Sequence, residues 1–232
     1  MHTSKTYQWL LFDADGTLFD YDRAEEKALE GTFQDFQLFF TGDHAGSYQK
    51  INHQIWLDFE NGLITAAELR VARFERLFAA ISIQADALHF SQRYLQNLAM
   101  ASDLIDGAEE TIRRLKGHYH LGLITNGLKD VQRPRLACSA IAGYFDAVAI
   151  SEELGAAKPD PLYFDLVFEM IGQPARKSVL VIGDSLSSDI QGGTNYGLDT
   201  CWFNPQGKPG RPELRVTYEI RRLEEIFQVL GK

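Results

Sequence analysis

Two aspartates separated by one residue follow the first apolar stretch of the chain and carry its strongest chemical signal. They are Asp13 and Asp15 in the segment Phe12-Asp-Ala-Asp-Gly-Thr-Leu18, where Gly16 lets the chain turn away. Residues two apart on a strand share a face, so the two carboxylates are expected near one another at the end of that strand. A turn in which an aspartate accepts hydrogen bonds from its own loop would show the same sequence pattern. The pair therefore indicates a site only together with other residues.

A second acidic pair follows a later apolar run, in Val181-Ile-Gly-Asp-Ser-Leu-Ser-Ser-Asp189. Asp184 ends the predicted strand, and Asp189 lies about one turn into the helix that follows. An ordinary strand-to-helix junction with an aspartate cap would also account for this pattern. If the two strands are neighbours, however, four carboxylates share one cleft. Such a cluster is repulsive unless a cation offsets its charge.

Three further residues could complete an anion-binding cleft. The segment Ile124–Gly127 ends a strand with the hydroxyl of Thr125 and continues, from Asn126, as a loop whose N–H groups could face an anion. Lys158, which precedes a proline, supplies an ammonium charge. Four carboxylates and one lysine sum to −3, which would repel a phosphate dianion, whereas one divalent cation brings the sum to −1. Oxygen ligands select a hard cation, so we predict Mg2+, with Mn2+ as a substitute.

Short apolar runs alternate with helical stretches over much of the chain and must position these residues. The predicted strands span 9–13, 121–125, 147–151, 179–184 and 200–203, and the predicted helices span 106–117, 128–139, 161–171, 186–196 and 223–230. This alternation is typical of an α/β fold, with a doubly wound, mostly parallel sheet covered on both faces. Pro134 lies inside one predicted helix, so we expect that helix to begin nearer the proline.

A proline-free stretch from Asp20 to about Ser102 separates the first strand from the others. Its apolar residues recur at helical spacing, and Thr65 with Glu68 has the S/T-x-x-E form of a capping box. We therefore predict an all-helical insert, residues 20–102, within an α/β core of residues 1–19 and 103–232. Because an insert at this point follows the carboxyl end of a strand, where open α/β proteins bind ligands, we expect it to act as a cap.

Composition and charge exclude several other classes of protein. The 232 residues are 45% hydrophobic and 24% charged, as in ordinary globular proteins. The net charge of −9 disfavours general nucleic-acid binding. The first apolar run is too short for a signal peptide or membrane span, and the two cysteines, Cys138 and Cys201, form no disulfide or zinc pattern. We expect a cytoplasmic monomer or homodimer that binds neither nucleic acid nor membranes.

The motifs D-x-D-G-T, T-N, K-P and G-D-S-x-x-x-D occur in this order between Asp13 and Asp189. Together they resemble the four motifs of the haloacid dehalogenase superfamily. Within that superfamily the chain is most similar to the pyrimidine 5′-nucleotidase subgroup. The segments behind this similarity are Trp56-Leu-Asp-Phe-Glu-Asn-Gly62 and Ile150-Ser-Glu-Glu-Leu-Gly-Ala-Ala-Lys-Pro159. The resemblance implies a Rossmann-type core with a small helical cap inserted between the first two motifs.

The resemblance also implies how the motif residues act on a phosphate ester. Asp13 would be the nucleophile and form an aspartyl-phosphate. Asp15 would protonate the leaving oxygen and then activate water. Thr125 and the backbone of Asn126 would bind the transferring phosphoryl group, and Lys158 would offset the charge between that group and the nucleophile.

The same resemblance implies the metal ligands and the reaction. The Asp13 carboxylate, the Asp15 carbonyl oxygen and the Asp184 carboxylate would ligate Mg2+. Asp189 would hold a metal-bound water or orient Lys158. The expected activity is that of a Mg2+-dependent phosphomonoesterase of the 5′-nucleotidase type, with a small-molecule phosphate monoester, a pyrimidine nucleoside 5′-monophosphate, as substrate.

Other functions fit part of this pattern. A phosphatase or mutase for small sugar phosphates or phosphoglycolate would use the same core. Dehalogenation is disfavoured, because Asp15 suits proton transfer to an ester oxygen and a departing halide needs no proton. A signalling receiver also gathers acids, a threonine and a lysine around Mg2+, but it is shorter and has no helical insert. A non-catalytic binding protein would leave the titratable groups unexplained.

Overall fold

The computed structural model describes residues 7–231 and divides the chain into two compact units. The α/β unit contains the chain up to Tyr21, the segment Asp103–Lys129 and everything from Leu136 onward. The helical unit contains Asp22–Ser102 together with the short segment Asp130–Arg135. A few residues far along the chain thus belong with the helices of the insert.

Six strands form the sheet of the α/β unit, and each pairs in parallel with its neighbours. They are β1 (Trp9–Asp13), β2 (His120–Thr125), β3 (Ala147–Ile150), β4 (Val179–Gly183), β5 (Asp199–Phe203) and β6 (Tyr218–Ile220). Their order is β3-β2-β1-β4-β5-β6, so the strand order reverses at β1. This confirms the predicted doubly wound sheet and makes the carboxyl end of β1 the switch point, where such sheets bind ligands.

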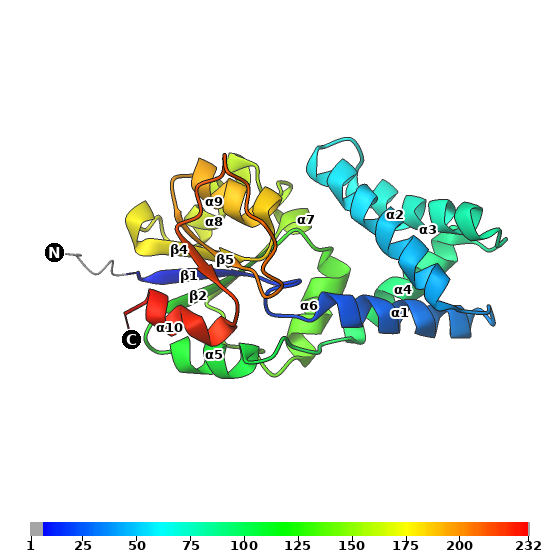
Figure 1. Ribbon diagram of the computed structural model, residues 1–232, viewed down its shortest axis with the longest axis horizontal. Helices are drawn as coiled ribbons and strands as arrows, with labels where there is room; N and C mark the ends of the chain where they lie inside the picture. Colours follow the sequence, from blue (N-terminus) through cyan, green and yellow to red (C-terminus); the bar gives the residue numbers. More distant parts are fainter. Residues whose placement is uncertain (1–6, 232) are drawn as a thin grey trace. The chain divides into compact units, whose positions relative to one another are not determined.

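Both faces of the sheet are covered by helices (Figure 1). Along β1, Leu10 and Phe12 pack in a core layer with α5 (Ala108–Leu115), whereas Leu11 packs in the opposite layer with α8 (Pro161–Met170). All three side chains are fully buried. Strands that are buried on both faces have continuous apolar sequences, which explains why these strands could be located from the sequence.

The remaining helical segments of the α/β unit are short. They are α7 (Ser151–Leu154), α9 (Gln191–Asn195), α10 (Ile226–Val229), two 3-10 turns at Arg176–Ser178 and Leu223–Glu225, and a π-helical turn at Leu186–Ile190. The predicted helix over 186–196 is therefore a π-helical turn that continues into α9. The edge strand β6 was not predicted, because three residues are too few to show a strand pattern.

The expected start of one helix near Pro134 was wrong. Helix α6 spans Lys129–Cys138, with the proline inside it, where it removes one helical hydrogen bond at a cost of about 3 kcal/mol. Residues on both sides of the proline make contacts within the helical unit. Arg135 is fully buried and donates to the Leu98 carbonyl, and Asp130 pairs with Arg70 at 3.1 Å. Tertiary contacts, rather than the local signal, set where this helix begins.

Four helices make up the insert within the helical unit: α1 (Tyr21–Asp35), α2 (Gly42–Glu60), α3 (Ala66–Ile81) and α4 (Ala87–Met100). The predicted capping box is confirmed, since the Thr65 hydroxyl accepts from the Glu68 N–H and the Glu68 carboxylate accepts from the Thr65 N–H. An aromatic core joins the helices, with the Phe90 ring 5.3 Å from Phe33 and 5.0 Å from Phe74 between centroids. Among the described residues, no helix is long and apolar enough to cross a membrane.

Candidate active site

The carboxyl ends of three adjacent strands bring most of the predicted site residues together. Asp13 is the last residue of β1 and is level with Ile124 in β2, so Thr125 ends the neighbouring strand one residue further along. On the other side, β4 pairs with β1 and Asp184 follows its last residue. The in-register parallel pairing therefore gathers motifs that lie far apart in the sequence.

Lys158 lies at the centre of the acidic groups. Its Nζ donates to Asp13 Oδ1 at 2.7 Å, to Asp189 Oδ1 at 2.6 Å and to the Ile124 carbonyl at 3.0 Å. An ammonium has three N–H donors, and here each has an acceptor. The side chain is 1% exposed, so the position of this charge is fixed. Burial alone would lower the pKa of Lys158, but the Asp13 and Asp189 carboxylates raise it above its usual range, and the lysine stays charged.

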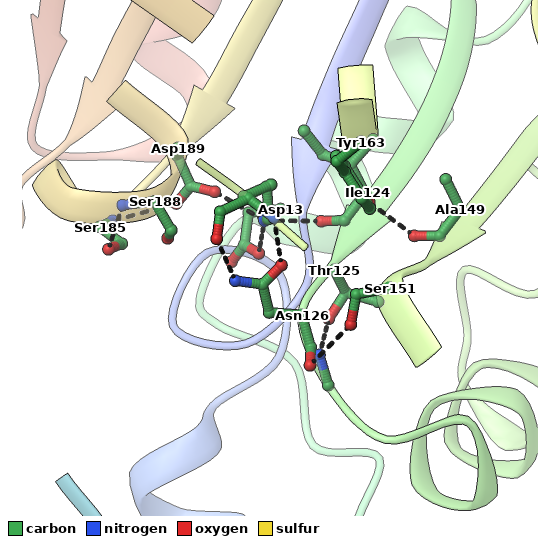
Figure 2. Close-up of polar contacts among 12 residues, drawn as sticks. Asp13, Ile124, Thr125, Asn126, Ala149, Ser151, Tyr163, Ser185, Ser188 and Asp189 are labelled. Carbon is green, nitrogen blue, oxygen red and sulfur yellow. Dashed lines mark hydrogen bonds and ion pairs between the residues drawn. The ribbon is translucent and has the colours of Figure 1, made fainter. Parts of the chain in front are cut away.

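The Asn126 side chain fixes the backbone of that lysine. Asn126 Oδ1 accepts from the Lys158 N–H at 2.8 Å, and Asn126 Nδ2 donates to the Lys158 carbonyl at 2.8 Å. The Asn126 carbonyl in turn accepts from the Ser151 hydroxyl at 3.1 Å, and Figure 2 shows these two residues in contact beside Asp13. Only the Asn126 backbone was predicted to belong to the site, and Ser151 was not predicted. The amide side chain has a separate task, which is to hold Lys158.

Three carboxylates are close enough to share a metal ion. One oxygen from each of Asp13, Asp184 and Asp189 lies within 4.8 Å of the others. Asp189 is fully buried, and its second oxygen accepts from the Ser185 N–H at 3.1 Å. With Lys158, these groups sum to −2, an excess that hard oxygen donors balance with Mg2+. The residues present therefore fit a divalent cation.

The carboxyl pKa values show the same excess of negative charge. Burial, followed by the nearby Asp189 carboxylate, raises the pKa of Asp184 to about 7. Burial and Asp189 also raise the pKa of Asp13 well above its usual range, although Lys158 opposes them. A cation among these oxygens would favour their ionised forms, which a nucleophilic carboxylate needs.

Two glycines leave room for the carboxylates. A Cβ atom on Gly183 would lie 2.2 Å from Asp189 Oδ2 and 2.6 Å from Asp189 Cβ. Gly16 has φ +84°, and a Cβ atom there would lie 2.7 Å from Asp184 Oδ2. The chain approaches the acidic cluster so closely at both places that any side chain would displace an aspartate.

The other predicted site residues lie on the loops beside this cluster. Thr125 is buried, and its hydroxyl oxygen accepts from the Gly127 N–H at 2.9 Å, which fixes the turn after β2. Asp15 lies two residues beyond Asp13, and its carboxylate is not part of the three-carboxylate cluster. The metal ligand predicted for Asp15 is its backbone carbonyl oxygen, not its carboxylate.

The switch-point strand of this doubly wound sheet thus ends in an aspartate beside a buried lysine and two further carboxylates, as the haloacid dehalogenase motifs predict. Residues 7–197 match the model of the haloacid dehalogenase-like hydrolases. The chain belongs to this family of hydrolases, as its motifs had indicated.

Relatives from bacteria match the chain along nearly its whole length. The HAD-hydrolase YfnB of Bacillus subtilis is 41% identical over 98% of this chain and 97% of that protein. The pyrimidine 5′-nucleotidase YjjG of Escherichia coli is 35% identical over 97% of this chain and 99% of that protein. The pyrimidine 5′-nucleotidase PynA of Streptococcus pneumoniae is 36% identical, over 97% and 96%. A crystal structure of YfnB bound to magnesium superposes with a TM-score of 0.93, over 98% of this chain and 100% of that one.

Proposed function

We propose that this protein is a Mg2+-dependent phosphomonoesterase that hydrolyses nucleoside 5′-monophosphates, with pyrimidine nucleotides preferred. The observation that carries the proposal is the buried Lys158 ammonium between Asp13 and Asp189, at the end of the switch-point strand. The family supports a hydrolase, and the relatives YjjG and PynA support the nucleotide as substrate.

In the first step, an Asp13 carboxylate oxygen attacks the phosphorus atom of the ester. The bond from that oxygen to phosphorus forms while the bond to the leaving ester oxygen breaks, and Asp15 gives its proton to the departing alkoxide. Lys158 holds Asp13 Oδ1 at 2.7 Å, which orients the nucleophile and offsets the charge that the phosphate brings. Thr125 and the Asn126 N–H bind the oxygens of the group being transferred.

In the second step, Asp15 takes a proton from water as the water attacks the aspartyl-phosphate. The bond between Asp13 and phosphorus breaks, inorganic phosphate leaves and both aspartates return to their starting states. Asp13, Asp184 and the Asp15 carbonyl would hold Mg2+ directly, and Asp189 would act through water, because its two oxygens already accept from Lys158 and Ser185. Bound Mg2+ supplies positive charge to the phosphoryl oxygens and to the nucleophile.

The test is phosphate release from a panel of nucleoside monophosphates and sugar phosphates, with Mg2+ and with a chelator, for the wild type and Asp13→Asn. We expect release that is fastest on pyrimidine 5′-monophosphates and is lost both with the chelator and in the variant. Release that survives either change would refute the mechanism. Metal-dependent release from sugar phosphates or phosphoglycolate alone would refute the nucleotide assignment and leave the mechanism intact.

A further inference from the structure

The segment that follows β5 repeats the arrangement that holds Lys158. Asn204 is 2% exposed, its Oδ1 accepts from the Lys208 N–H at 2.8 Å, and its Nδ2 donates to the Lys208 carbonyl at 2.9 Å. Nδ2 also donates to Glu219 Oε1 at 2.8 Å, on β6. An asparagine after a strand thus holds both backbone groups of a lysine, as Asn126 holds those of Lys158.

This segment begins beside the acidic cluster. Strand β5 pairs with β4, with Trp202 level with Gly183, and Trp202 Nε1 donates to the Asp184 carbonyl at 2.9 Å. Burial and the Asp189 carboxylate raise the pKa of Asp184, and Lys208 is the weakest of the groups that oppose this rise. Lys208 is exposed, and it has no ion pair with any residue in the range 7–231. Its ammonium is therefore available to an incoming anion.

We propose that Lys208 is a substrate-binding residue whose ammonium attracts the dianionic phosphate of the ester to the cluster of aspartates. The inference rests on the proposed function and extends it. Asp13, Asp184, Asp189, Lys158 and a divalent cation sum to 0, so a phosphate dianion meets no net attraction from the cluster, and one more ammonium supplies it. The Asn204 contacts supply the order that an exposed lysine otherwise lacks, since they fix its backbone.

The position of Lys208 predicts which kinetic constant depends on it. It lies outside the buried contacts among Asp13, Lys158 and Asp189, so it acts alike on the bound ester and on the transition state. Uniform binding of this kind lowers KM and leaves kcat unchanged. Because the charge is exposed to solvent, its effect also weakens as salt is added.

The test compares Lys208→Gln and Lys208→Arg with a matched control, Lys177→Gln. Lys177 is also exposed, but it lies in the turn before β4, at the amino ends of the strands, whereas the acidic cluster lies at their carboxyl ends. With 4-nitrophenyl phosphate and Mg2+, we expect KM to rise about 3- to 10-fold in Lys208→Gln at low salt, with kcat within about twofold. The Arg variant should retain the wild-type KM, and the rise should shrink between about 20 and about 200 mM salt. An unchanged KM in Lys208→Gln, a rise equal to that of the control, or a fall confined to kcat would overturn the inference.

A binding measurement separates this inference from the proposed function. If the wild type hydrolyses no phosphate ester, the proposed function fails, and binding of inorganic phosphate in the presence of Mg2+ then tests Lys208 by titration calorimetry. We expect the dissociation constant for phosphate to be about 3- to 10-fold higher in Lys208→Gln than in Lys177→Gln. Equal constants, or no binding of phosphate to the wild type, would refute the role of Lys208.

Discussion

The Asn126 side chain offers a quantitative test of how the site is held together. Asn126→Ala removes two 2.8 Å hydrogen bonds and leaves the N–H and C=O of Lys158 without these partners. Each buried polar group left unsatisfied costs about 1–3 kcal/mol. Since Asn126 is itself only partly buried, we take the lower half of that range. We expect the free energy of unfolding to fall by about 2–4 kcal/mol.

Thermal and urea unfolding, followed by circular dichroism, would measure this loss. For a chain of this size each kcal/mol lowers the Tm by about 2–4 °C, so the variant should melt roughly 5–15 °C below the wild type. Asn195→Ala is the matched control, because Asn195 is exposed and its amide oxygen accepts from the Gln191 side chain one helical turn earlier. That control should stay within about 0.5 kcal/mol of the wild type.

The same variant tests whether catalysis depends on the position of Lys158. If Asn126 places Lys158, its loss should reduce kcat/KM for a phosphate ester by about 10- to 100-fold, because small displacements of a catalytic group have effects of this size. A stability equal to that of the control would refute the argument that the amide holds the lysine. Lost stability with full activity would show that Lys158 keeps its place through its side-chain contacts alone.

Three further predictions follow from the geometry. Gly183→Ala should lower stability by about 1–3 kcal/mol and weaken Mg2+ binding in calorimetry, because the new methyl group collides with Asp189; unchanged affinity would contradict this. The pKa of Asp184 is raised to about 7, so Mg2+ must displace a proton below that pH. The rise in Tm on adding Mg2+ should therefore be larger at pH 8 than at pH 6, and equal shifts would be evidence against the raised pKa. Ellman's reagent should label exposed Cys138 in the folded protein and Cys201 only after unfolding, since burial raises the pKa of Cys201 to about 12; two equally fast thiols would be inconsistent with that burial.

The parts of the fold that the sequence predicted are those with strong local patterns. Strands buried on both faces show as apolar runs, and Asp13 and Asp184 could be assigned to strand ends because such runs stop just before or at them. Where local and tertiary preferences compete, the prediction failed. The start of α6 was predicted wrongly, because the helix continues through Pro134 and Asp130 and Arg135 on either side of it make contacts within the helical unit. These contacts join residues dozens of positions apart, and no short pattern contains them.

The two asparagine–lysine pairs differ in how far apart their members lie along the chain, and therefore in whether the sequence could predict their contacts. Asn204 and Lys208 are four residues apart, so their contacts lie within one loop and a short sequence pattern could reveal them. Asn126 and Lys158 are 32 residues apart and meet only because β2 and β3 pair in parallel and deliver both loops to one edge of the sheet. The residue types at the strand ends therefore indicate which chemistry the site can support, whereas the order of the strands decides which side chains hold the reactive groups in place. For that reason Asn126 could be predicted as a member of the site, but its main task could be found only in the fold.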